Sequence, residues 1–135
     1  MKWTDNEPVY GDMIRVKVKF YYHYGIFVNE NSVIQFGLPD NIGVPTDEIC
    51  VVETDIDTFS GGNFIEKAEL TDSDEKRKCR KPEEIVSIAR AALGQNGYNI
   101  LHNNCEHFVY GCVFGEKRSF LDEAREAIRK KLNKG

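Results

Sequence analysis

The first half of the chain alternates between apolar and polar residues. Residues 13–20 do so most regularly, with arginine and lysine between the apolar positions Ile14, Val16, Val18 and Phe20. A period of two predicts a half-buried strand with those four side chains in the core. Further strands are predicted where β-branched and aromatic runs are bounded by turn-forming residues, over residues 21–28, 33–36 and 49–53. Residues 64–70 are ambiguous.

The second half of the chain has helical periodicity. Pro82 suits the first turn of a helix whose apolar stripe ends before Gly94 and consists of Ile85, Ala89, Ala92 and Leu93. A second helix is predicted from about Asn104 to Gly115, and a last one over residues 119–133. Residues 97–101 suggest a short extended piece, and the charged residues 71–81 suggest a linker.

Length and composition limit the possible classes of protein. The 135 residues fit a single domain, 1–135, with 41% hydrophobic and 30% charged residues. The net charge of −4 argues against binding of nucleic acid through bulk positive charge. Neither a transmembrane segment nor a secretory signal is predicted, so we expect a soluble, cytoplasmic protein whose cysteines are reduced. The sequence does not predict an oligomeric state.

Reactive side chains are densest between residues 102 and 108. Cys105 lies at the predicted start of a helix, where the helix dipole and unpaired N–H groups favour a thiolate and would lower its pKa. The same N–H groups could stabilise an oxyanion during acyl transfer. A buried, unreactive cysteine is the alternative interpretation of Cys105, and it is the one we prefer for the remaining three: Cys50, Cys79 and Cys112.

A nucleophilic thiol needs a base, and the chain has three histidines. His107 lies on a different face of the helix from Cys105, and His102 precedes that helix. His23 lies in a predicted strand, where it is either a structural residue or an imidazole beside the thiol. His102, Cys105 and His107 also form an H-x-x-C-x-H pattern, but no second pair of ligands accompanies it. We therefore expect neither a metal site nor a cofactor.

A longer motif surrounds the cysteine. Residues 104–109 read N-C-E-H-F-V, which resembles the motif of lecithin:retinol acyltransferase-like proteins, in the NlpC-like group of circularly permuted papain folds. Pro8-x-x-Gly11-Asp12-x-Ile14 resembles the opening of that family, and residues 22–28 resemble its histidine strand. The resemblance extends over about residues 8–120.

The resemblance implies an α+β fold, with an N-terminal antiparallel sheet followed by packed helices. It also implies that Cys105 is the nucleophile and His23 its base. The third polar residue of such proteins lies twelve residues after the histidine, which is Gln35 here, where the family most often has a second histidine. A glutamine amide can still accept the imidazole N–H, as the asparagine of papain-like enzymes does.

The resemblance further implies acyl transfer through a thioester, from a glycerophospholipid ester to water, an amine or an alcohol. The alternatives are an amidase or peptidase of the same superfamily and a non-catalytic binding module. The expected partners are a lipid or other acyl donor and, transiently, a membrane surface. We expect any contact with anionic membranes to come from the basic residues 76–81 or from the last helix.

Overall fold

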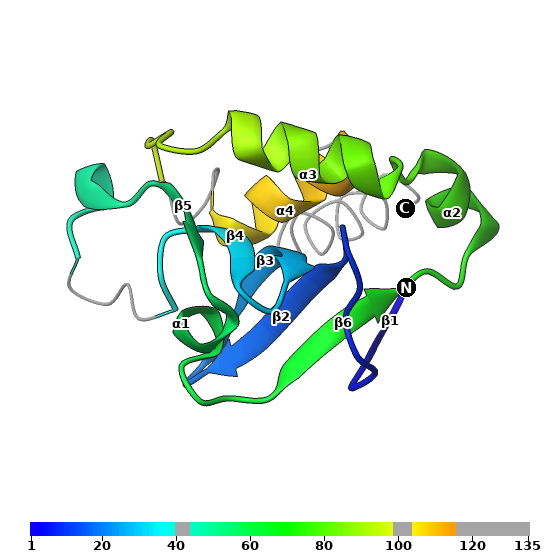
Figure 1. The fold of residues 1–135 in the computed structure, drawn as a ribbon, viewed down its shortest axis with the longest axis horizontal. Coiled ribbons are helices and arrows are strands. Elements are labelled where there is room, and N and C mark those ends of the chain that lie inside the picture. The colour runs from blue at the N-terminus through cyan, green and yellow to red at the C-terminus, as the bar shows by residue number, and fades with distance from the viewer. Residues whose placement is uncertain (40–43, 99–103, 116–135) are drawn as a thin grey trace, which may run out of the picture.

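A six-stranded antiparallel sheet runs through the residues that the computed structural model describes, which are 1–39, 44–98 and 104–115. The strand order is β1-β6-β2-β3-β4-β5 (Figure 1). The strands are β1 (Lys2–Thr4), β2 (Met13–Val18), β3 (Tyr21–Asn29), β4 (Ser32–Phe36), β5 (Val51–Thr54) and β6 (Ile65–Glu69). The four predicted strands are confirmed to within two residues or so at each end, the ambiguous segment forms β6, and β1 was not predicted.

Phe20 lies outside the core, so its predicted burial is wrong. Val18 pairs with Tyr21, which makes Lys19 and Phe20 the two-residue turn between β2 and β3. The side chain of Phe20 is 97% exposed. The alternation of apolar and polar residues continues for two residues past Val18, where β2 ends. Periodicity alone therefore does not reveal that the chain reverses there.

The helices flank the sheet. They are α1 (Ile56–Ser60), α2 (Ser73–Lys78), α3 (Pro82–Ala91) and α4 (Cys105–Phe114), with a short 3-10 helix η1 (Thr46–Glu48). The two predicted helices that begin near Pro82 and Cys105 are confirmed as α3 and α4. Ala92 and Leu93 lie just past the end of α3, and Leu93 is partly exposed. The helix predicted over residues 119–133 lies outside the described residues.

Residues 71–81 were predicted to be a linker, but they contain helix α2. Asp72 caps this helix, and it forms a capping box with Glu75. Acidic residues occupy the first turn and basic residues occupy the last turn, which suits the helix dipole. The capping box and the placement of its charges stabilise this helix. It has no buried residues, so its sequence shows no apolar periodicity that would predict a helix.

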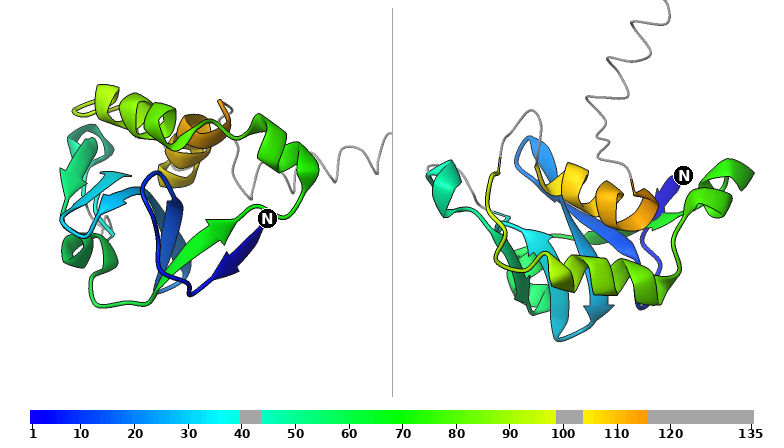
Figure 2. Two further views of the ribbon diagram at one scale, coloured as in Figure 1. Left: turned by 45° about the vertical axis from the view of Figure 1, so that its right-hand side comes forward. Right: turned by 90° about the horizontal axis from the view of Figure 1, so that it is seen from above.

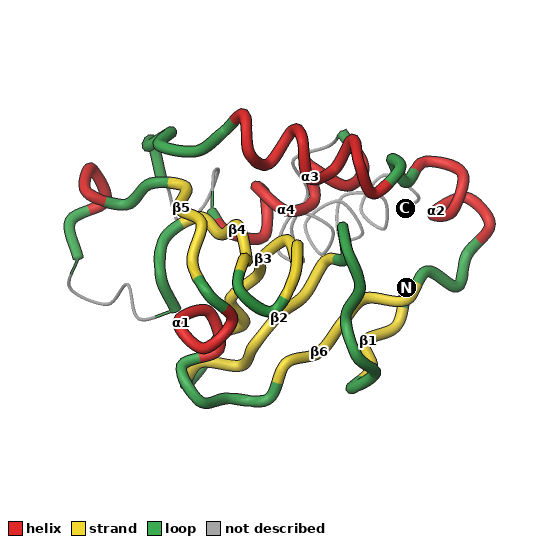
Figure 3. The backbone as a smooth tube through the Cα atoms, viewed as in Figure 1, coloured by secondary structure: helices red, strands yellow, loops and turns green. Residues whose placement is uncertain are grey.

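Each face of the sheet has its own core. On one face, α3 and α4 pack on β3 and β4 around residues such as Tyr24, Ile26 and Ile34 (Figures 1 and 2). The other face is covered by α1 (Figure 3), whose Phe59 packs among side chains of β2, β3 and β4. The α+β class is therefore confirmed, except that α1 precedes the last strand, so the strands do not all come before the helices.

None of the helices in the described part of the chain is both long enough and apolar enough to cross a bilayer.

Candidate active site

Cys105 is the first residue of α4. Asn104 caps the helix: its side-chain oxygen accepts the N–H of His107 at 3.0 Å, and its own N–H donates to Nδ1 of His107 at 3.3 Å. This reciprocal pair fixes the first turn and leaves the thiol at the positive end of the helix dipole. His107 is buried in this capping role. The site of His102 lies outside the described residues.

His23 and Gln35 form a direct hydrogen bond inside the protein. Nε2 of His23 lies 2.6 Å from Oε1 of Gln35, and both side chains are buried. Gln35 also donates through Nε2 to the hydroxyl of Thr54 on β5, at 2.6 Å. The Thr54 hydroxyl in turn donates to the backbone carbonyl of Asp55 at 3.0 Å. The result is a continuous chain of hydrogen bonds from β3 across β4 to β5.

This chain of hydrogen bonds fixes which nitrogen of His23 carries the proton. The single hydroxyl proton of Thr54 goes to Asp55, so the Thr54 oxygen must accept from the Gln35 NH₂ group. Gln35 then presents its carbonyl oxygen to Nε2 of His23, which has to be the protonated nitrogen. Nδ1 is therefore left with a lone pair. Nothing in the local sequence of Thr54 marked it for this role.

Burial keeps His23 neutral. The ring packs against that of Phe59, with 5.4 Å between the ring centroids. Removal from water lowers the pKa of His23 from 6.5 to about 4, while the hydrogen bond to Gln35 acts in the opposite direction. The imidazole is therefore an uncharged proton acceptor at neutral pH.

Burial also keeps Cys105 protonated, so the prediction of a lowered pKa is wrong. Removal from water raises the pKa of Cys105 to about 11, and the charge of Glu106 acts in the same direction. Backbone groups of Tyr24, Glu106 and Cys105 itself lower the pKa, but by less than burial raises it. The helix terminus does favour the thiolate as expected, but desolvation is the larger effect.

The thiol and the imidazole converge on one stretch of β3. Cys105 lies against the backbone of Tyr24, the residue after His23. Gly25 is the last residue of β3 that pairs with β4 toward this end, opposite Gln35, so the thiol meets β3 just beyond the point where the two strands separate. His23 faces the α1 side of the sheet, and Tyr24 faces the α4 side. Among the described residues, no hydrogen bond joins the thiol to the His23 ring.

The sequence profile described as "Lecithin retinol acyltransferase" matches residues 6–118, a stretch that includes Cys105, His23 and Gln35. The chain belongs to the lecithin retinol acyltransferase family. The resemblance seen in the sequence is thereby confirmed.

Individual relatives support the family assignment. Lecithin retinol acyltransferase of Mus musculus is 31% identical over 147 residues, covering 90% of this chain and 63% of the relative. The Homo sapiens protein of that name is 31% identical over 126 residues, covering 78% and 54% respectively. "Phospholipase A and acyltransferase 3" of Homo sapiens is 27% identical over 133 residues, covering 90% and 79%. The chain thus spans 63% and 54% of the lengths of these two lecithin retinol acyltransferases.

Elsewhere in this family member, the other cysteines have different surroundings. Cys112 is buried two turns along α4, where burial raises its pKa to about 12. Cys79 follows α2, and its pKa is raised by partial burial and by the charge of Asp12. Cys50 is half-buried just before β5. Neither Cys79 nor Cys50 lies at the start of a helix, in contrast to Cys105.

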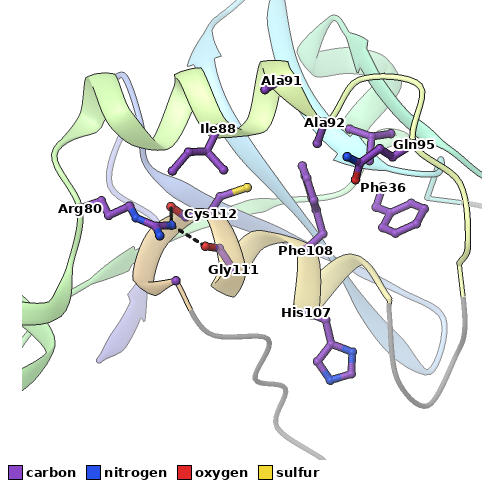
Figure 4. Close-up of a pocket in the computed structure, with 12 residues that line it drawn as sticks. Phe36, Arg80, Ile88, Ala91, Ala92, Gln95, His107, Phe108, Gly111 and Cys112 are labelled. Atoms are coloured by element: carbon purple, nitrogen blue, oxygen red, sulfur yellow. Dashed lines mark hydrogen bonds between the residues drawn. The ribbon is translucent and has the colours of Figure 1, made fainter.

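A pocket of about 480 Å³ lies between α3 and α4 (Figure 4). Its walls combine polar and apolar surface, with Phe36, Ile88 and Phe108 among the apolar residues. Arg80 lies at one end, where its guanidinium donates to the carbonyl oxygens of Gly111 and Cys112 at 2.8 and 3.2 Å. The lining includes neither Cys105 nor His23 nor Gln35, so the pocket is separate from the candidate reaction site.

Proposed function

We propose that the chain is a cysteine-dependent acyltransferase or phospholipase that works through an acyl thioester on Cys105. The proposal includes a single domain with the circularly permuted papain-like fold. The observation that carries it is the hydrogen-bonded pair of His23 and Gln35, because the thiol at the start of α4 contacts the backbone of Tyr24, the residue after His23. The family and the relatives named phospholipase A and acyltransferase support an ester as the substrate.

Acylation begins from the neutral pair. Nδ1 of His23 takes the proton of the Cys105 thiol while the sulfur attacks the carbonyl carbon of a glycerophospholipid ester. The S–C bond forms, and the carbonyl oxygen takes the negative charge. When the tetrahedral intermediate collapses, the ester C–O bond breaks, and the proton on His23 passes to the departing lysophospholipid oxygen. The products are an acyl thioester and a neutral imidazole.

Transfer to the acceptor repeats these steps in the same order. Nδ1 of His23 takes a proton from water, an amine or an alcohol, whose oxygen or nitrogen attacks the thioester carbonyl. The C–S bond breaks, and the proton returns to the sulfur, which restores the buried thiol. Gln35 stabilises the transient imidazolium because its Oε1, 2.6 Å from Nε2 of His23, accepts a hydrogen bond from the Nε2–H group.

The start of α4 supplies the groups that would stabilise the oxyanion. Backbone groups of Cys105 and Glu106 already lower the pKa of the thiol, so their N–H groups lie close to the sulfur. An oxygen that develops negative charge one bond from the sulfur would meet the same N–H groups and the same end of the helix dipole. These donors come from the backbone, so their positions depend on the Asn104 cap.

The proposal is tested with a panel of substrates. We expect release of fatty acid or its transfer to an amine from phosphatidylcholine, and no release of amine from peptides of matched length. Cys105→Ala should abolish turnover, and Cys112→Ala, in the same helix, should retain it. Peptide cleavage without phospholipid turnover would instead support the amidase or peptidase alternative. Turnover that survives Cys105→Ala would contradict the assignment of the nucleophile.

A further inference from the structure

Two phenylalanines project fully into solvent. Phe20 and Phe64 are each 97% exposed, more than any other large apolar residue in the described part of the chain. Phe20 lies in the turn between β2 and β3, and Phe64 immediately precedes β6. An isolated, partly exposed apolar side chain is ordinary on a protein surface. Two fully exposed aromatic rings together are instead typical of a surface that binds another molecule or a membrane.

Both phenylalanines lie at the same end of the sheet. Ile65 pairs with Val16, so Phe64 continues β6 alongside the last residues of β2. Phe20 lies two residues beyond Val18, the last residue of β2. Figure 1 shows the end of β2 and the start of β6 together at the lower left of the molecule. The two rings therefore project from adjacent loops.

This end of the sheet is also the end that holds the candidate active site. His23 is three residues from Phe20 on the same hairpin. Gln35 is the second-last residue of β4, and this end of β4 lies at the same end of the sheet. Tyr21 beside the turn donates its hydroxyl to the carbonyl of Pro39, at 2.6 Å, which fixes the segment after β4 to the hairpin. Leu38 in that segment is 45% exposed and adds a third apolar group to the rim.

The turn has a conformation that the local sequence does not favour. Lys19 has a φ of 54°, and it is the only residue other than glycine with positive φ in the described part of the chain. Two-residue hairpin turns favour asparagine, aspartate or glycine at such positions, and not a lysine followed by a phenylalanine. The turn thus displays a cationic and an aromatic side chain where smaller residues would fold more easily.

The charge beside the rings is positive although the whole chain has a net charge of −4. Lys17 and Lys19 are exposed, and neither forms an ion pair with a described residue. The acidic residues of η1 precede β5, at the edge of the sheet, two strands away from the hairpin. Lysines beside exposed aromatic rings are the combination that binds an anionic lipid surface.

We propose that Phe20 and Phe64, flanked by Lys17 and Lys19, form a docking edge that inserts into the surface of a phospholipid bilayer. The edge brings to the lipid the end of the sheet that holds the candidate site. The inference agrees with the proposed function but does not need turnover. It is an alternative to the expectation that residues 76–81 or the last helix make the contact. Residues 76–81 belong to the region of α2, at the opposite end of the molecule (Figure 1).

The experiment is co-sedimentation with vesicles of phosphatidylcholine containing phosphatidylserine, carried out with the whole chain. We expect F20S and F64S each to weaken binding by about tenfold, and the double variant by about a hundredfold. The matched control is V9S/Y10S, because Val9 and Tyr10 are 58% and 43% exposed in a turn at the far end of the sheet. The control should bind as the wild type does.

Several results would overturn the proposal. One is equal binding of wild type, F20S/F64S and V9S/Y10S, and another is an equal loss in both double variants. A third is a dimer, seen by light scattering, that F20S/F64S dissociates without any change in vesicle binding, since the rings would then contact a second copy. Vesicle binding is scored in the Cys105→Ala background as well, and it should not change there. Wild-type protein that binds vesicles yet turns over no ester would contradict only the proposed function.

Discussion

Gln35 is the residue on which the arrangement of the candidate site depends most. It is completely buried, it accepts from His23, and it donates to Thr54. We expect Gln35→Ala to lower turnover by about 10- to 1,000-fold, since a hydrogen bond to a charged group contributes about 1.5–3 kcal/mol. Gln35→His should retain or raise activity, because the resemblance to the family implies a histidine at this position. Wild-type turnover of Gln35→Ala, measured beside an inactive Cys105→Ala, would reduce the site to a dyad.

Thr54 orients the amide of Gln35. Thr54→Val keeps the shape of the side chain but removes the oxygen that accepts from Gln35. The amide is then free to rotate and to offer its NH₂ group to His23, which would favour the wrong tautomer. We expect kcat to fall about tenfold with KM nearly unchanged, an effect of about 1.4 kcal/mol. A matching loss in Thr54→Ser, which keeps the hydroxyl, would show that packing and not the hydrogen bond is responsible.

The low pKa of His23 makes the fold sensitive to acid. The unfolded chain takes up this proton near pH 6.5, whereas the folded protein resists until about pH 4. Stability from this group is therefore complete above pH 6.5 and is lost as the pH falls through 4, which amounts to about 3 kcal/mol. Denaturant titrations from pH 7 to pH 4 should show this slope in the wild type. His23→Asn, which cannot titrate, should lack it, and an identical slope in that variant would assign the effect to other groups.

At the scale of elements, Gly25 sets how closely α1 can approach β3. A Cβ at this position would lie 2.7 Å from the ring of Phe59 and 2.9 Å from Val33. Phe59 is the ring that packs against His23, so Gly25→Ala should displace both aromatic groups. We expect a loss of about 1–3 kcal/mol in the free energy of unfolding, from overpacking, together with reduced turnover. The double variant Gly25→Ala/Phe59→Leu should recover part of the stability, and no recovery would place the strain elsewhere.

The sequence predicted those strands and helices whose pattern of apolar residues is visible over a few consecutive turns or residue pairs. The alternation in residues 13–18 and the apolar spacing after Pro82 were sufficient for β2 and α3. Helix α2 was missed because its signal is the capping pair of Asp72 and Glu75, with no apolar stripe. The prediction of a lowered pKa for Cys105 was wrong because the burial of the thiol comes from strands some eighty residues earlier in the chain. Thr54 was missed for a related reason, since its link to Gln35 exists only through strand pairing.

At the scale of the whole molecule, the two faces of the sheet hold different parts of the candidate site. Its α4 face carries the thiol and most of the core, and its other face carries the packing of Phe59 against His23. Both parts lie near the point where β3 and β4 separate, at the end of the sheet from which Phe20 and Phe64 project. A lipid surface that met this end would lie close to the proposed nucleophile, whereas the basic helix α2 would point away from it.

The central claim is that Cys105 carries an acyl group during the reaction. Intact-mass measurement after brief incubation with a phospholipid tests it most directly. We predict an added mass equal to one fatty acyl group, lost on treatment with neutral hydroxylamine, mapped to the peptide that contains Cys105. The adduct should be absent from Cys105→Ala and present in Cys112→Ala. Phospholipid turnover with no adduct in the wild type, or an adduct that persists in Cys105→Ala, would contradict the account.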